Sequence, residues 1–140
     1  MADVHSKEVR SHNMSRIRSK NTKPELLVRK FLFANGFRYR LHNKLLPGKP
    51  DIVLNKYHTV IFIHGCFWHK HENCKYAYVP ASNTNYWLPK LDKNVEKDTY
   101  AIKELKKMNW KVLVVWECDL KPNKQAKNLK KILRIMKDEN

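Results

Sequence analysis

The apolar side chains of residues 26–33 recur at the spacing of one helix face, and this run has both a start signal and a stop signal. Thr22 and Glu25 form a capping box, with Pro24 in the first turn. Gly36 follows the last apolar residue, where a helix commonly ends. The pattern therefore predicts a first helix that begins at the Thr22 cap and is closed by Gly36.

Three segments with strand patterns follow this helix. Phe37, Tyr39 and Leu41 alternate with basic residues, as in a half-buried strand. After a turn rich in proline and glycine, "DIVL" at 51–54 and "TVIFI" at 59–63 are apolar and rich in β-branched residues. The polar "NKYH" between them predicts a hairpin that enters the centre of the sheet.

The second half of the chain adds two helices and a strand. Val95, Ile102 and Leu105 recur at roughly helical spacing within residues 92–108, and the apolar run "KVLVVWEC" at 111–118 predicts a buried strand. The basic segment after residue 121 has an apolar face typical of an amphipathic helix. A helix between two strands usually joins parallel neighbours. The order of elements predicts a mixed α/β sheet flanked by helices.

Length and composition indicate one domain. The 140 residues contain no internal repeat, so we expect a single domain over residues 1–140. Residues 1–21 are polar and basic, with too few apolar side chains for a core of their own, and we expect them to form an arm that becomes ordered on a ligand. Residues 121–140 hold the basic C-terminal helix.

The charge narrows the class of partner. The chain has 29 Lys and Arg against 13 Asp and Glu, a formal net charge of +16 and a pI near 9.9. This favours a polyanionic partner, with nucleic acid ahead of an anionic membrane surface. The odd number of cysteines, three, and the lack of a signal-peptide or membrane-spanning apolar run predict a reduced, cytoplasmic protein.

The segment "IHGCFWHKHENC" concentrates potential metal ligands. Cys66, His71 and Cys74 are closely spaced, and Cys118 ends the last predicted strand. Three cysteines and one histidine form an ordinary closed, tetrahedral zinc site, so we expect one structural zinc that fastens this loop to the sheet edge. The alternatives are plain reduced thiols, and His69 in place of His71 as the histidine ligand.

Asp51 is the first candidate for catalysis. It follows Pro50 at the start of a predicted strand, where a carboxylate can face a cleft and bind Mg²⁺. In a basic protein this suggests hydrolysis of a phosphodiester, although a simple turn aspartate is the alternative. The pattern resembles the Pro-Asp half of the restriction-endonuclease signature. The place of its Glu-x-Lys partner holds residues 62–64, "FIH", so either the site is inactive or histidines replace the missing groups.

His69 and Asp98 make the histidine variant chemically reasonable. A neutral imidazole can take a proton from water, and a carboxylate on its other nitrogen fixes the tautomer. The alternatives are a solvated loop histidine and an exposed helix aspartate paired with lysine at helical spacing.

Aromatic residues in polar loops also need an explanation. Phe67, Trp68 and Trp87 either pack as core beneath a loop or insert as a wedge between base pairs. Unstacking is easiest at a mispaired step, so a wedge would select mismatched DNA. Trp110 and Trp116 are assigned to the core.

Several blocks together resemble one known family. "MADVHSKEVRSHNMSRIRSKNT", "LPGKPDIVL", "VIFIHGCFWHKHENC", "VPASNTNYW", "KNVEKD" and "WKVLVVWEC" are similar, in order and spacing, to the very short patch repair (Vsr) DNA mismatch endonucleases over about residues 1–120. The resemblance implies a restriction-endonuclease-like fold, a structural zinc and a catalytic Mg²⁺. It also implies nicking of one strand 5′ to the thymine of a T:G mismatch left by deamination of 5-methylcytosine.

The resemblance also assigns roles to residues. Asp51 and the main-chain carbonyl of Ile63 would bind Mg²⁺, although threonine is common at the position of Ile63. His69 would activate water, Asp98 would orient His69, and His64 would support the phosphate or the metal-bound water.

The remaining roles concern zinc and DNA. Zinc would fall on the four ligands proposed above, Cys66, His71, Cys74 and Cys118. The DNA-binding residues would be Met14 in the N-terminal arm and the wedge of Phe67, Trp68 and Trp87.

We therefore expect a strand-specific, Mg²⁺-dependent, zinc-stabilised endonuclease that acts as a monomer on double-stranded DNA with a T:G mismatch. Its expected setting is the bacterial cytoplasm and nucleoid, with mismatch-repair proteins as partners and a functional link to a cytosine-5 DNA methyltransferase. Two alternatives are a non-catalytic zinc-stabilised nucleic-acid-binding module and a restriction-type nuclease without mismatch selection.

Overall fold

The computed structural model describes residues 22–77 and 84–137. The predicted N-terminal arm, with Met14, lies outside the described residues, as do residues 78–83. The described elements run in this order: α2 (Lys23–Ala34), β1 (Arg40–Leu41), β2 (Ile52–Leu54), η1 (Asn55–Tyr57), β3 (Thr59–His64), η2 (Lys75–Ala77), α3 (Thr84–Lys107), β4 (Lys111–Trp116), η4 (Glu117–Leu120) and α4 (Gln125–Lys137).

The described strands form one mixed sheet in the order β1-β2-β3-β4. β2 pairs antiparallel with both β1 and β3. The predicted hairpin is the connection between β2 and β3. β4 pairs parallel with β3, and α3 connects the two as a crossover. The predicted mixed α/β fold and the parallel pair are thus confirmed. The register places His64 beside Trp116, at the carboxyl ends of the two parallel strands.

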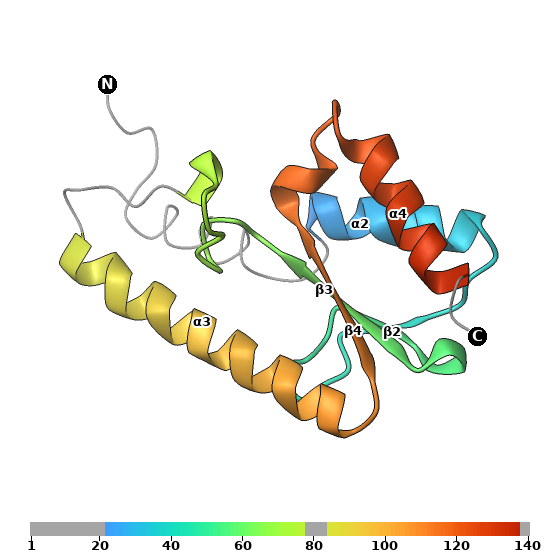
Figure 1. Ribbon diagram of the computed structural model, residues 1–140, viewed down its shortest axis with the longest axis horizontal. Coiled ribbons are helices and arrows are strands. Elements are labelled where there is room, and N and C mark those ends of the chain that lie inside the picture. The colour runs from blue at the N-terminus through green and yellow to red at the C-terminus, as the bar shows by residue number, and fades with distance from the viewer. Residues whose placement is uncertain (1–21, 78–83, 138–140) are drawn as a thin grey trace, which may run out of the picture.

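Helices cover both faces of the sheet, with α2 and α4 on one face and α3 on the other (Figure 1). Val28 of α2 and Ile132 of α4 pack with Ile61 of β3 in one cluster. Leu105 of α3 packs with Val60 of β3 in a second cluster. Because both faces are covered, β2 and β3 are apolar almost throughout and do not alternate with polar residues.

The start and end of α2 agree with the sequence signals. The hydroxyl of Thr22 accepts a hydrogen bond from the backbone N–H of Glu25 at 3.4 Å. The helix ends at Ala34, and Gly36 follows with φ of +89°, a conformation that glycine adopts without steric cost. This fixed start matters for function because the first turn of α2 borders the candidate site.

Two elements differ from the sequence prediction. α3 begins at Thr84, earlier than the predicted residue 92, and continues through Pro89. Proline usually ends or bends a helical pattern, so the sequence carried no signal for the first turns. Trp87 therefore lies in a helix, whereas the sequence pattern predicted that it lies in a loop. β1 is only two residues long and begins at Arg40, later than the predicted alternation from Phe37. It ends at Leu41 because His42 has φ of +47°, which is incompatible with a continuing strand.

Candidate active site and metal cluster

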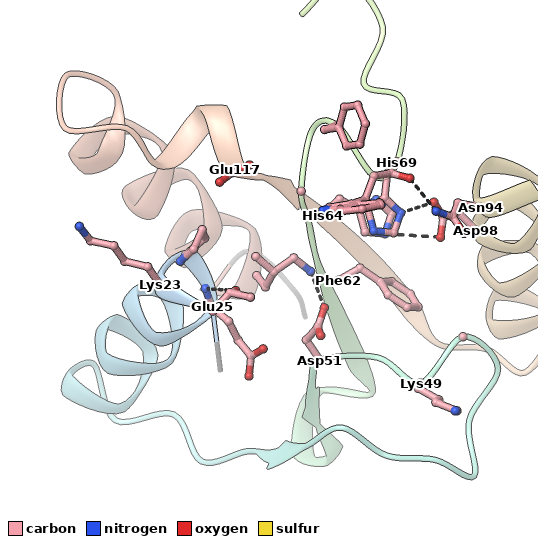
Figure 2. Close-up of a pocket in the computed structure, with 17 residues that line it drawn as sticks. Lys23, Glu25, Lys49, Asp51, Phe62, His64, His69, Asn94, Asp98 and Glu117 are labelled. Carbon is pink, nitrogen blue, oxygen red and sulfur yellow. Dashed lines mark hydrogen bonds and ion pairs between the residues drawn. The ribbon is translucent and has the colours of Figure 1, made fainter. Parts of the chain in front are cut away.

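A cleft of about 710 Å³ opens beside the carboxyl end of β3, between the first turn of α2 and the middle of α3. Figure 2 shows Asp51 below the end of β3, with His64 and His69 above it and Asp98 approaching from α3. The four predicted catalytic residues, Asp51, His64, His69 and Asp98, all line this cleft. Residues separated by up to 47 positions along the chain therefore meet in one concave site.

Asp51 is held in place by the neighbouring strand. Its Oδ2 accepts a hydrogen bond from the backbone N–H of Ile63 at 2.7 Å. Burial raises the pKa of Asp51 to about 6, although the hydrogen bond from Ile63 acts in the opposite direction. A partly buried carboxylate with one oxygen fixed and a raised pKa is typical of a residue that binds a cation or a proton in its function.

Glu25 and His42 meet in a buried polar contact beside Asp51 that no sequence pattern predicted. Glu25 Oε2 lies 2.7 Å from His42 Nε2 and 3.3 Å from an Arg29 nitrogen, and the Glu25 side chain is only 2% exposed. The backbone N–H of His42 donates to the carbonyl of Asp51 at 3.1 Å. Ligand atoms of Glu25, His42 and Asp51 all lie within 4.8 Å of one another.

The local sequence patterns around Glu25 and His42 differ. Glu25 is explained by its capping box, and that local pattern does not indicate that it lies near the site. His42 falls on the polar side of an alternating strand pattern, which predicts solvent exposure. Its left-handed backbone turns the side chain towards Glu25 instead, and no pattern in the sequence indicated that turn.

His69 and Asp98 form the dyad that was expected of a water-activating site. His69 Nδ1 lies 2.5 Å from Asp98 Oδ2. His64 stacks on His69, with ring centroids 3.9 Å apart and planes 4° apart, and its Nε2 lies 3.9 Å from Asp98 Oδ1. Burial, and then the neighbouring His69, lower the pKa of His64 to about 4, so His64 is neutral at pH 7.

The predicted zinc ligands also come together. The ligand atoms of Cys66, His71, Cys74 and Cys118 lie within 4.8 Å of one another, and Cys118 Sγ is 3.5 Å from His71 Nδ1. Zn–S bonds of about 2.3 Å in a tetrahedron place sulfur atoms roughly 3.8 Å apart, so the spacing and the Cys3His donor set suit a structural zinc. The cluster contains His71 and not His69.

Zinc chemistry also suits the environment of these thiols. Burial raises the pKa of the Cys66 thiol to about 12, so this group would hold its proton at pH 7 without a cation nearby. Zinc displaces such a proton when it binds, and the resulting thiolate is a ligand.

Turns in the backbone separate the two histidines of this loop. The N–H of His69 donates to the carbonyl of Gly65 at 3.1 Å, and the N–H of His71 donates to the carbonyl of Cys66 at 3.0 Å. One histidine side chain therefore meets Asp98 of α3, while the other meets Cys118 after β4. The loop therefore contributes His69 to the dyad with Asp98 and His71 to the Cys3His cluster.

Trp116 lies between these two groups, which corrects its assignment to the core. It is partly buried, and its ring stacks on His71 with centroids 3.9 Å apart. It also meets His64 edge-on at 5.1 Å. Trp110 is likewise only partly buried, packing against the α3 side of the sheet and stacking on His58. The sequence predicts burial for a tryptophan at the end of an apolar strand, because the run of apolar residues does not show where the strand leaves the packed interior.

The three predicted wedge aromatics form one cluster at the edge of the cleft. The rings of Phe67, Trp68 and Trp87 touch pairwise, with centroids 5.0 to 5.7 Å apart. Asn94 of α3 donates to the carbonyl of Trp68 at 2.9 Å and ties the loop to the helix. Tyr86, which was not predicted, packs against Trp87 at 4.9 Å and is 60% exposed.

Comparison with known proteins identifies the family. The family model for the DNA mismatch endonuclease Vsr matches residues 2–75. The type II nicking enzyme V.NmeAIP of Neisseria meningitidis is 53% identical over 140 residues, which cover 99% of both chains. The DNA mismatch endonuclease Vsr of Escherichia coli K12 is 46% identical over 121 residues, which cover 86% of this chain and 77% of that one. The chain belongs to the Vsr family.

Membership of the Vsr family settles the class of activity. The chain is a DNA endonuclease of the nicking type, which hydrolyses phosphodiester bonds, and its substrate is DNA. The predicted family and enzyme class are thus confirmed, and the alternative of a non-catalytic binding module is wrong. In the described part of this Vsr-family chain, no helix has the length and apolar character that crossing a membrane requires.

Proposed function

We propose that the protein nicks one DNA strand 5′ to the thymine of a T:G mismatch, by Mg²⁺-dependent hydrolysis. The observation that carries the proposal is the single cleft in which Asp51 and the His69–Asp98 dyad meet, bordered by the aromatic cluster. One E. coli relative is named a DNA mismatch endonuclease, which supports the mismatch as substrate. Deamination of 5-methylcytosine is the chemical source of such a mismatch.

Asp51 and the main chain of Ile63 are the proposed holders of the magnesium ion. The N–H of Ile63 faces Asp51, and the N–H and C=O groups of a strand residue point to the same side, so the carbonyl of Ile63 is expected to face Asp51 as well. Carboxylate and carbonyl oxygens suit Mg²⁺. When bound, the ion supplies positive charge that stabilises the negative charge developing on the phosphate.

His69 is the proposed general base. Asp98 accepts the proton on Nδ1, so the other ring nitrogen, Nε2, is left unprotonated to take a proton from water. Asp98 then stabilises the imidazolium that forms. His64 stays neutral because of its lowered pKa, and we assign it the role of a hydrogen-bond donor to a phosphate oxygen.

The aromatic cluster is the proposed source of mismatch selection. Insertion of Phe67, Trp68 and Trp87 between base pairs costs a few kcal/mol of stacking per step. A T:G pair stacks and pairs less well than a T:A pair, so this cost is lower at the mismatch. Mutual ring contacts and the bond from Asn94 hold the cluster in position before DNA binds.

The experiment uses end-labelled duplexes that are identical except for a central T:G or T:A pair. We expect nicking of the T:G duplex in Mg²⁺, little nicking of the T:A duplex, and none in EDTA. Asp51→Ala should lower the nicking rate on the order of 10³-fold. Glu104→Ala is the matched control and should keep full activity, because Glu104 lies near the other end of α3 and, among the residues that the structure describes, its ion pair is with Lys107.

Two outcomes would overturn the proposal. Equal nicking of both duplexes would indicate a nuclease without mismatch selection. Two relatives are named type II nicking enzymes, and those names do not mention a mismatch. Full activity of Asp51→Ala would remove the proposed metal site.

A further inference from the structure

A second cleft, of about 500 Å³, adjoins the first at the His69–Asp98 dyad, which lines both. The two clefts share five residues, Gly48, Lys49, His69, Asn94 and Asp98. Lys44 and Lys97 line only the second cleft, while Phe67 and Trp68 line only the first. The dyad therefore stands between an aromatic end and a lysine end of one continuous groove.

The lysine end carries charge that the described residues do not neutralise. Lys44, Lys49 and Lys97 form no ion pair within residues 22–77 and 84–137, whereas nearby Lys70 pairs with Asp92 at 2.6 Å. The carboxylate of Asp98 faces this cleft, but it is engaged by His69. Positive charge in a concave site beside the dyad suits an anion.

The loop that carries Lys49 is fixed against α3. A side chain at Gly48 would place its Cβ only 2.6 Å from Cβ of Ala101, so only glycine fits there. The N–H of Lys49 donates to the carbonyl of Leu46 at 3.1 Å, and Lys49 itself has φ of +50°. Such a backbone is uncommon for a residue other than glycine and is often found at functional sites. Figure 2 shows the Lys49 side chain extending away from Asp51.

We propose that the second cleft binds the phosphodiester group immediately 5′ to the scissile one, through Lys44, Lys49 and Lys97. The direction rests on the proposed function. The mismatched thymine lies 3′ to the nick and is met by the aromatic end, so the strand leaves the dyad on its 5′ side towards the lysine end. The lysines then neutralise the phosphate 5′ to the nick, while the scissile phosphate lies at the Asp51 site.

The test combines a lysine substitution with a neutral phosphate analogue. A methylphosphonate replaces one charged phosphate of the T:G duplex, either one position 5′ or one position 3′ of the scissile bond. Single-turnover nicking is measured over a range of enzyme concentrations, which separates the half-saturating concentration from the maximal rate. The variants are Lys97→Ala and Lys44→Ala, with Lys103→Ala as control, because Lys103 is exposed on α3 and lines neither cleft.

For the wild type, we expect the 5′ methylphosphonate to raise the half-saturating concentration about fivefold. Lys97→Ala and Lys44→Ala should cause similar losses on the unmodified duplex. Either variant combined with the 5′ methylphosphonate should lose no more than one change alone, because both remove the same contact. The losses should multiply for the 3′ methylphosphonate, and Lys103→Ala should bind normally.

Three results would overturn the inference. The 5′ methylphosphonate could leave the wild type unaffected, its effect could multiply with that of both lysine variants, or the coupling could appear at the 3′ position. Failure of the proposed function gives a different result, because the wild type would then not nick the unmodified T:G duplex. The assignment of the second cleft to the 5′ phosphate would be wrong in that case as well.

Discussion

Trp116 stacks face to face on His71, with ring centroids 3.9 Å apart and planes 4° apart, and the same indole meets His64 edge-on at 5.1 Å. His64 in turn stacks on His69. One side chain at the end of β4 therefore connects the Cys3His cluster with His64 and, through it, with His69. We expect a zinc ion in this cluster to orient, through Trp116, the two histidines that we propose act on DNA.

Trp116→Ala is expected to lower the maximal nicking rate about 10- to 100-fold, because His64 and His69 lose their lateral support. The half-saturating DNA concentration should change little, and zinc should stay bound. Trp116→Phe keeps an aromatic face against His71 and should recover most of the rate. A matched control is Trp110→Phe, which changes a tryptophan stacked on His58 and should leave the rate unchanged. A Trp116→Phe enzyme as slow as Trp116→Ala would contradict the orienting role.

Zinc content should distinguish the two histidines of the loop. His71→Ala and Cys118→Ser should each lose the metal, and both should unfold at lower temperature, because the binding energy of a structural zinc is also folding energy. His69→Ala should retain one zinc per chain while losing activity, since His69 faces Asp98. Metal analysis and thermal unfolding of the three variants provide the measurement. Zinc loss in His69→Ala alone would reverse the assignment.

The raised pKa of Asp51 predicts how stability depends on pH. The folded protein holds the proton up to about pH 6, whereas the unfolded chain releases it near 3.8. Unfolding therefore releases a proton between these values, and the free energy of unfolding falls as pH rises through this window. Asp51→Asn removes the titration. Without divalent metal it should be more stable than the wild type by on the order of 2 kcal/mol at pH 8, and equally stable below pH 4.

Denaturant unfolding at pH 3.5 and pH 8 measures this difference. Magnesium should stabilise the wild type at pH 8 and leave Asp51→Asn unchanged, because the carboxylate is the proposed ligand. Equal stabilities at pH 8 in the absence of metal would show that burial does not disfavour the charged carboxylate.

Glu25→Ala should destabilise the fold by about 3 kcal/mol, because it leaves the partly buried His42 and Arg29 without their shared carboxylate. Glu96→Ala, at an exposed position of α3, is the control and should change stability by less than about 0.5 kcal/mol. Urea unfolding of the two variants measures both values. A Glu25→Ala variant as stable as the control would mean that the ion pair makes no net contribution.

Sequence patterns predicted the elements whose signals are local. A backbone preference is encoded within a few residues by the cap at Thr22, by Gly36 and by the β-branched runs of β2 and β3. The elements that these signals predict are present in the structure. The Cys3His cluster was predictable because thiolate and imidazole at these spacings have few other uses, and the structure brings the four side chains together. The His69–Asp98 dyad was named from chemistry and family resemblance, and the structure brings its two residues together.

The features that were missed depend on tertiary contacts. Trp116 meets His71 because β4 lies in parallel register beside β3, which places it next to His64. His42 meets Glu25 through a single left-handed residue, and the first turns of α3 persist despite Pro89. None of these relations has a signature in the local order of apolar and polar residues, since each is set by packing between distant segments.

The position of the nick tests the central claim most directly. A duplex with one T:G pair, labelled in turn on each strand, is incubated with the enzyme and Mg²⁺, and the products are sized to single-nucleotide resolution. We predict one product, cut at the phosphodiester 5′ to the mismatched thymine, with the guanine strand intact. Cleavage of the guanine strand, or cuts at the same positions in the matched T:A duplex, would contradict the account.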